Sequence, residues 1–170
     1  NHPDCLREAM IFLIALHDLG KISEGFRRML RGQAAAPKFR HWEVSEFMLL
    51  HHDKSVARAL GGDPRKREIL YAAVAGHHGR PSALKLPSVN SRRIRFGPKD
   101  EALKIAGTGI SSANEVIEHF AALWPTASIE ELDLSRAQEL SWWLAGICTT
   151  ADWIGSNTEW FPPQQTVVPL

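Results

Sequence analysis

Residues 9–21 have the sequence Ala-Met-Ile-Phe-Leu-Ile-Ala-Leu-His-Asp-Leu-Gly-Lys, in which eight apolar residues lead directly into a histidine and an aspartate. A segment that is apolar around most of its circumference is typical of a helix buried in a protein core. Glycine commonly ends a helix. We therefore expect a buried helix over residues 5–19 that stops at Gly20 and presents His17 and Asp18 at its end.

Adjacent residues on a helix point about 100° apart, so His17 and Asp18 could not hold the same metal ion from the middle of a helix. At a loosened helix end both side chains can reach one ion, or the aspartate can bridge two ions while the histidine binds one. The alternative is that the pair only caps the end of a buried helix.

Helical patterns continue along most of the chain. Asp63-Pro64 is a typical helix start, and the capping-box patterns Ser112-Ala-Asn-Glu115 and Ser135-Arg-Ala-Gln138 predict two more. The expected further helices are 23–31, 41–52, 64–77, 112–124 and 135–155. Prolines, serines and arginines over 80–98 predict a long loop, and the strand signal is negligible. The sequence thus predicts an all-α helical bundle that forms a single domain over residues 1–170.

Composition limits the classes of function that the chain can have. A formal charge of +1 over 170 residues gives no global signature for nucleic acid, so any basic surface has to be local. The longest apolar run is too short to span a membrane, and no segment resembles a secretion signal. Two cysteines are too few for a disulfide framework. We expect a cytoplasmic protein with no membrane partner.

Three further motifs supply imidazole and carboxylate groups. His77 and His78 form a pair at another expected helix end. Asp152 lies in an otherwise apolar helix, where a carboxylate needs a cation or a hydrogen-bond donor. His41 opens an expected helix, and Ser45, one turn later, could orient the imidazole or a metal-bound water. Such ligands suit divalent Mn, Co, Ni, Fe or Zn ions better than Mg²⁺.

Each motif also has a plain structural interpretation. A histidine pair at a helix end complements the helix dipole, Asp152 can form a structural salt bridge, and His41 can be an ordinary N-terminal residue. Other histidines are not expected to be ligands. Eleven residues of helix separate His41 from His52 by about 16 Å, and we expect His51 and His119 to be surface or structural residues as well.

Motifs that resemble those of the HD superfamily of metal phosphohydrolases occur in order along the chain: His17-Asp18 with Gly20-Lys21, His41 with Ser45, Gly76-His77-His78-Gly79 and Ala151-Asp152-Trp153. The doubled histidines and the segment Ala-Asp-Trp-Ile-Gly-Ser at 151–156 are similar, more specifically, to the HD nuclease domain of the CRISPR-associated nuclease-helicase of type I interference systems. This resemblance extends from about residue 9 to residue 162.

The resemblance implies a helical bundle that surrounds one or two transition-metal ions. It also implies that this domain cleaves single-stranded DNA in CRISPR interference, an antiviral defence. It implies that Asp18 bridges two ions. The remaining ligands would divide into His17 and Asp152 at the first site and His41, His77 and His78 at the second. Lys21 matches a family lysine that stabilises developing charge or helps the leaving group, and a solvated lysine beyond a helix end is the alternative. The implied partners are a helicase domain or subunit and an RNA-guided surveillance complex.

The family pattern also includes a histidine a few dozen residues before the His-Asp pair, whereas sixteen residues precede His17 here. His2 is a poor substitute, because a helix over residues 5–17 would place it about 20 Å from the site. We expect the segment with that ligand, and the helicase part, to lie outside this chain. This predicts a weak first metal site and a second site with four protein ligands.

Arg92, Arg93 and Arg95 cluster in the expected loop and are candidates for contacts with DNA phosphates, with solvated loop charge as the alternative. Two rival functions fit the same motifs. One is an HD phosphohydrolase that acts on nucleotides or cyclic nucleotides. The other is a non-catalytic docking module with a degenerate metal site, for which Trp160 and Phe161 are candidate interface residues.

Overall fold

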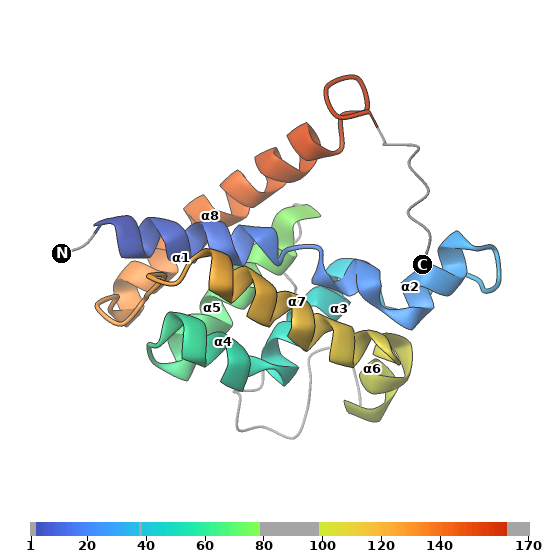
Figure 1. Cartoon of the computed structure of the whole chain (residues 1–170), viewed down its shortest axis with the longest axis horizontal. Helices are drawn as coiled ribbons and strands as arrows, with labels where there is room; N and C mark the ends of the chain where they lie inside the picture. Colours follow the sequence, from blue (N-terminus) through green and yellow to red (C-terminus); the bar gives the residue numbers. More distant parts are fainter. Residues whose placement is uncertain (1–2, 38, 79–98, 163–170) are drawn as a thin grey trace.

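The computed structural model describes residues 3–37, 39–78 and 99–162, and this part of the chain is helical without a strand (Figure 1). The predicted all-α bundle is therefore confirmed, while the predicted loop over 80–98 lies outside the described residues. In chain order, with η marking a 3-10 helix, the elements are α1 (Pro3–Ala15), η1 (Leu19–Ile22), α2 (Glu24–Leu30), α3 (His41–His51), α4 (Asp53–Leu60), α5 (Pro64–Ala75), η2 (Gly76–His78), α6 (Lys99–Ala106), α7 (Gly109–Leu123) and α8 (Leu134–Gly155).

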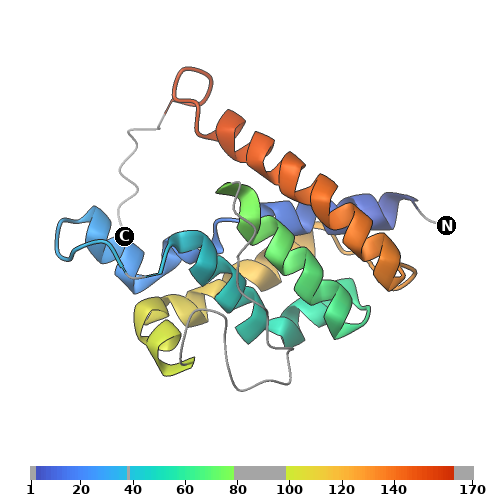
Figure 2. The same ribbon diagram turned by 180° about the vertical axis from the view of Figure 1, so that it is seen from behind.

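The core forms where the longer helices meet. α5 packs against both α8 and α3, η1 packs against α3, and α1 contacts α5, α7 and α8. Two opposite views show α8 lying along one side of the bundle, with its C-terminal part extending beyond the other helices (Figure 1 and Figure 2). Side chains with no exposed surface fill the space between the helices: Phe12, Leu13, Leu16, Met48, Leu70, Val74 and Ile117. Burial of each of these side chains stabilises the fold by about 1.5–3 kcal/mol. This core therefore fixes the relative positions of the helix ends.

The first helix is shorter than predicted. α1 ends at Ala15, a turn follows, and Gly20 lies inside η1 with a φ outside the left-handed region that a glycine stop adopts. Glycine is required here for a different reason. A Cβ atom at this position would overlap the carbonyl oxygen of His41 and the amide nitrogen of Ser45. Gly20 therefore lets η1 approach the first turn of α3.

The predicted helix starts are partly right. The Asp63 side chain accepts a hydrogen bond from the Arg65 amide at 2.8 Å, which confirms the predicted N-cap of α5. The capping box at Ser112 is wrong, because the chain turns at Gly107, with a φ of 53°, and α7 already begins three residues before the serine.

The capping box at Ser135 is also wrong. Asp133 caps α8 instead, and its side chain accepts a hydrogen bond from the Arg136 amide at 2.8 Å. The helices α4 and α6 have no counterpart among the predicted helices. Each contains eight residues, which is too few for a clear apolar repeat.

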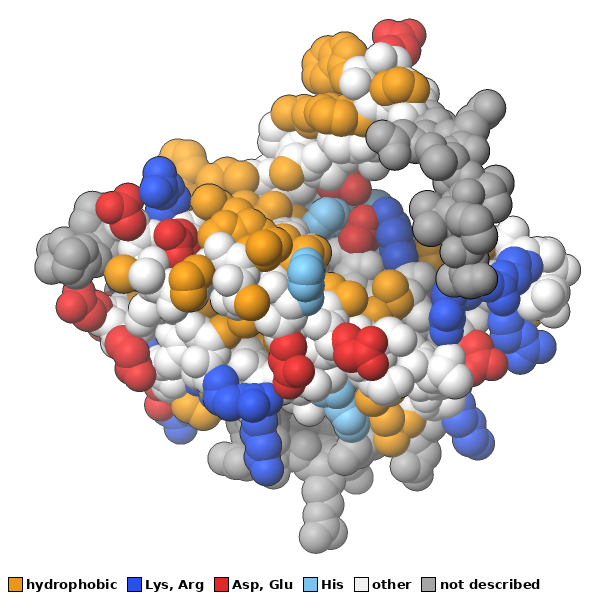
Figure 3. All heavy atoms as spheres, in the orientation of Figure 1, with side chains coloured by type: hydrophobic (Ala, Val, Ile, Leu, Met, Phe, Trp, Pro, Cys, Tyr) orange, Lys and Arg blue, Asp and Glu red, His pale blue; other side chains and the backbone are white. Residues whose placement is uncertain are grey.

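At 22 residues, α8 is the longest of the described helices, and only one of its faces is buried. Leu144 and Cys148 point into the bundle. The most exposed apolar side chains of α8 are Trp142 at 77%, Trp153 at 74% and Trp143 at 73%. Figure 3 shows apolar atoms along this projecting helix. Trp160 and Phe161 beyond its end are exposed, and no described helix is long and apolar enough to cross a membrane.

Candidate metal centre

The six residues predicted as metal ligands come from four separate parts of the chain. They are His17 and Asp18 in the turn after α1, His41 at the start of α3, His77 and His78 in η2, and Asp152 in α8. Packing of α3, α5 and α8 brings these parts together. The space-filling view shows histidine, acidic and basic side chains side by side in a recess below α8 (Figure 3).

The Asp18 carboxylate lies at the centre of the group. Its Oδ1 is 3.4 Å from His41 Nε2 and 3.8 Å from His77 Nε2. Its Oδ2 is 3.2 Å from His17 Nε2, and Asp152 Oδ1 is 3.6 Å from the same histidine nitrogen. The two carboxylate oxygens of Asp18 therefore face different sets of imidazoles, as a bridging carboxylate requires.

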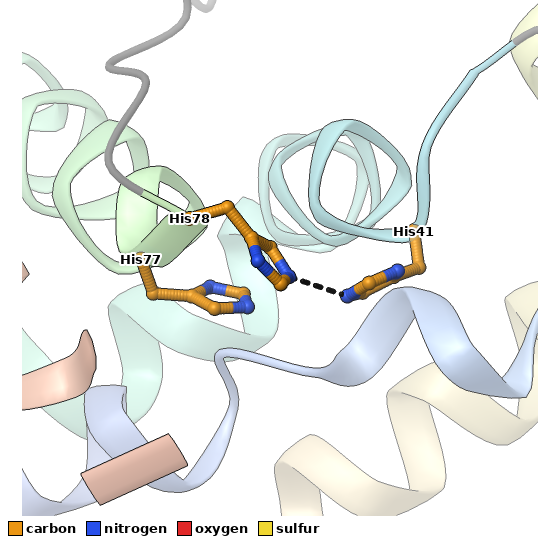
Figure 4. A group of neighbouring side chains, drawn as sticks. All are labelled: His41, His77 and His78. Atoms are coloured by element: carbon orange, nitrogen blue, oxygen red, sulfur yellow. Dashed lines mark hydrogen bonds between the residues drawn. The ribbon is translucent and has the colours of Figure 1, made fainter. Parts of the chain in front are cut away.

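His77 and His78 lie beside each other in η2, facing His41 at the start of α3 (Figure 4). His78 Nε2 is 3.1 Å from His41 Nε2. Potential ligand atoms of these three histidines lie within 4.8 Å of one another, and so do those of His17, Asp18 and His77. Two ligands that are each about 2.1 Å from one ion are at most about 4.2 Å apart. Small side-chain adjustments are therefore enough for either group to hold an ion, and His77 belongs to both.

The same local contact orients His17 and His77. In each case Nδ1 lies 2.8 Å from the carbonyl oxygen three residues earlier, that of Ile14 or Val74. Carbonyls in the last turn of a helix have no partner within the helix, so they are free to accept this bond. A neutral imidazole that donates from Nδ1 keeps its lone pair on Nε2. The two helix ends thus fix the tautomer that a metal ligand needs.

Three buried atoms at the centre have no hydrogen-bond partner among the described residues: His17 Nε2, Asp18 Oδ1 and His77 Nε2. An unpaired buried polar atom costs roughly 1–3 kcal/mol. Imidazole lone pairs and a carboxylate that face one another are satisfied together by a divalent cation. The residues present therefore fit one or two divalent ions.

Comparison with known protein families agrees with this chemistry. A family model described as "Cas3, HD domain" matches residues 2–161, which is most of the chain. The chain belongs to the Cas3 HD-domain family. This is a family of CRISPR-associated HD nucleases, and HD domains bind divalent metal ions. No curated protein and no solved structure matched the chain.

Electrostatics in this HD domain set the protonation states that metal binding requires. Burial lowers the pKa of His41 to about 4 and also lowers the pKa of His77. Burial alone would raise the pKa of Asp18, but its contacts with His17 and Lys21 hold that pKa well below its usual range. At neutral pH Asp18 is therefore an anion and both imidazoles are neutral. A cation can bind to these three groups without displacing a proton.

We expect the metal-free HD domain to lose stability as the pH falls from about 7 to about 5. Unfolded histidines bind a proton near pH 6.5, about their ordinary pKa, whereas burial lowers the pKa values of His41, His52 and His77 in the folded state. The unfolded chain binds more protons in this window, so the free energy of unfolding decreases. His17 opposes the trend, because contacts with Asp18 outweigh its burial and raise its pKa.

Thermal unfolding in EDTA across this pH range measures the effect. The midpoint temperature should rise with pH, since three histidines act in one direction and one in the other. His41→Gln should show a smaller slope. A midpoint that stays constant, or that rises toward acid pH, would contradict the neutral state assigned to these imidazoles.

Ser45 and Lys21 both contact the segment that carries Asp18. The buried Ser45 hydroxyl accepts a hydrogen bond from the Gly20 amide at 2.7 Å, so this serine holds η1 in place. The prediction gave Ser45 a contact with the His41 imidazole or a metal-bound water, and the contact observed is with the neighbouring backbone. The Lys21 ammonium contacts Asp18 Oδ2, and the Lys21 side chain is 41% exposed.

Two residues beside the candidate ligands were not predicted from the sequence. The Thr149 hydroxyl donates a hydrogen bond to the His77 carbonyl at 2.7 Å and so ties η2 to α8. The ring centroid of Trp42 lies 4.6 Å from that of His78. Position alone could have indicated them: Thr149 lies about one turn before Asp152 on α8, and Trp42 directly follows His41, the candidate ligand that opens α3.

The other predicted residues are not among the candidate ligands. Arg92, Arg93 and Arg95 lie outside the described residues. His52 Nε2 is 2.9 Å from the Ile110 carbonyl oxygen, which fits its predicted structural role. His119 is exposed on α7.

Proposed function

We propose that this HD domain is a metal-dependent nuclease that hydrolyses phosphodiester bonds of single-stranded DNA in CRISPR interference. One observation carries the proposal: buried, unpaired ligand atoms of His17, Asp18 and His77 face one another in a domain of an HD nuclease family. We assign Asp18 as the ligand shared by two ions. The other ligands are His17 and Asp152 for one ion and His41, His77 and His78 for the second.

Two ions held by these residues would supply an activated water molecule and would neutralise charge on the phosphodiester. The side chains of the protein itself set up this chemistry. Asp18 is ionised and keeps negative charge at the centre of the imidazoles, while the carbonyls of Ile14 and Val74 hold the two Nε2 lone pairs in place. Lys21 contacts Asp18 and is partly exposed, and we assign its ammonium the role of stabilising negative charge on a substrate phosphate.

We expect the protein to cleave labelled single-stranded DNA with Mn²⁺, Co²⁺ or Ni²⁺, and at least about tenfold more slowly with Mg²⁺ alone. Imidazole-rich sites favour these transition ions, whereas Mg²⁺ prefers oxygen ligands and gives up its water reluctantly. Initial rates after EDTA treatment, dialysis and addition of each ion measure the preference. Efficient cleavage with Mg²⁺ alone, or cleavage that survives removal of all metal, would contradict the assignment.

The same assay separates the rival functions when a panel of nucleotides and cyclic nucleotides is run beside the DNA. A small-molecule phosphohydrolase would hydrolyse members of the panel and leave the strand intact, and a docking module would act on neither substrate. We further propose that a helicase region and an RNA-guided surveillance complex present the strand to this domain, as association with them is a feature of the family.

A further inference from the structure

A pocket of about 170 Å³ opens beside the metal centre, between α2 and the start of α3. Its walls are mostly apolar and include Phe26 and Met29 of α2, Pro37 and Phe39 of the connecting segment, and Trp42 of α3. His41 also lines the pocket, while its Nε2 faces Asp18. A single candidate ligand therefore borders both the pocket and the metal centre.

Aromatic rings continue from the pocket to the histidines. The centroid of the Phe26 ring is 5.4 Å from that of His41, and the Trp42 ring lies 5.2 Å from His41 and 4.6 Å from His78. The pocket is smaller than the roughly 300–1,000 Å³ that drug-sized ligands occupy. A single planar ring system suits such a space, and every nucleobase has a face that packs on aromatic side chains.

The segment that builds this pocket carries a local excess of positive charge. From Lys21 to Glu43 the sequence contains six lysine and arginine residues and two glutamates, a balance of +4, whereas the whole chain carries only +1. Arg28 and Arg31 are exposed at the end of α2 and just beyond it, and the exposed Arg40 also lines the pocket. Figure 3 shows lysine and arginine atoms gathered at the α2 end of the molecule. A polyanion is therefore attracted to the side of the metal centre where the pocket opens.

We propose that this pocket binds one base of the DNA strand, next to the phosphate that the metal centre cleaves. The inference rests on the proposed nuclease function and names one part of its substrate site. Because the walls offer mainly apolar and aromatic contacts, the pocket recognises the presence of a base and not its identity. A base held there keeps the neighbouring phosphate in register with the metal ligands.

Filling the pocket tests the proposal without cleavage. Ala36 is exposed and lines the pocket, so Ala36→Phe occupies the space and changes no candidate ligand. Ala34→Phe is the matched control, because Ala34 is exposed on the same segment and is not part of the lining. In EDTA, we expect a fluorescent oligothymidylate to bind about tenfold more weakly to Ala36→Phe than to the wild type. Ala34→Phe should bind like the wild type, and equal affinities of the two variants would overturn the proposal.

A strand with one abasic unit gives a second readout, with Mn²⁺ present. In the product ladder of an end-labelled strand, we expect the wild type to cut one phosphate beside the abasic unit about tenfold less than the others. In Ala36→Phe the ladder should weaken at every position and this gap should disappear. A wild-type ladder without a gap would contradict base binding. If the wild type cuts no DNA with any ion, the nuclease proposal fails, and the comparison in EDTA still decides whether the pocket holds a base.

Discussion

Asp18→Ala is expected to abolish metal binding and to lower the rate of DNA cleavage at least about a thousandfold. The Asp18 carboxylate lies 3.2–3.8 Å from the Nε2 atoms of His17, His41 and His77, so its removal takes away the ligand shared by both proposed ions. A thousandfold change corresponds to roughly 4 kcal/mol of transition-state stabilisation, which is within what bound metal ions supply. Metal content by mass spectrometry and initial cleavage rates measure the two effects.

Asp4→Ala is the matched control for this substitution. Asp4 lies in the first turn of α1, pairs with Arg7 on the surface, and has a side chain that is 69% exposed. This variant should keep the metal content and the rate of the wild type. If Asp18→Ala retained both its metal and its activity, the assignment of Asp18 as a ligand would be wrong. If the wild type cuts no DNA and Asp18→Ala behaves like the wild type, the result would instead favour a non-catalytic docking module.

Gly20→Ala is expected to lower the cleavage rate about a hundredfold, although it adds a single methyl group two residues from Asp18. The new Cβ atom would overlap backbone atoms of His41 and Ser45 in the first turn of α3. Backbone atoms within a helix cannot move aside as the end of a flexible side chain can. η1 then has to move away and take Asp18 with it. A displacement of about 1 Å at a catalytic site can cost about a hundredfold in rate, and the overpacking costs about 1–3 kcal/mol of stability.

Gly146→Ala separates this effect from glycine substitution in general. A Cβ atom at Gly146, on α8, meets no other atom within 4 Å. Alanine there should keep the wild-type rate and leave stability unchanged or slightly higher, because alanine favours a helix more than glycine does. Metal affinity, cleavage rate and thermal unfolding of the two variants provide the comparison. A Gly20→Ala protein as active as Gly146→Ala would show that the contact between η1 and α3 does not position Asp18.

The sequence alone predicts the long helices and the chemical type of the site, because both depend on local patterns. His17 and Asp18 end an apolar run, and Asp152 lies inside an apolar helix. Polar groups in such segments need a hydrogen-bond donor or a cation as a partner, whatever the tertiary fold. The helix starts are less predictable. A serine followed three residues later by a glutamate can also lie inside a helix, as Ser112 and Glu115 do in α7. The pattern alone cannot distinguish such a position from a true helix start.

Features that depend on contacts between distant segments could not be predicted from the sequence. Gly20 was assigned to a helix stop, and its actual role, a close approach to α3, involves residues more than twenty positions away. Thr149 and Trp42 are near candidate ligands in the sequence, but their contacts with η2 form only in the folded domain. The aromatic pocket beside His41 also depends on three segments that meet only in the folded domain.

The most direct test of the proposed metal centre is anomalous scattering from crystals of the protein soaked with Mn²⁺ and, separately, with Co²⁺. The arrangement of the side chains predicts an ion bound to Asp18 together with imidazoles from the group of His41, His77 and His78, and a second ion, if present, beside His17 and Asp152. Anomalous peaks that avoid Asp18, or ions held only by residues elsewhere on the surface, would contradict the metal centre and the nuclease function proposed from it.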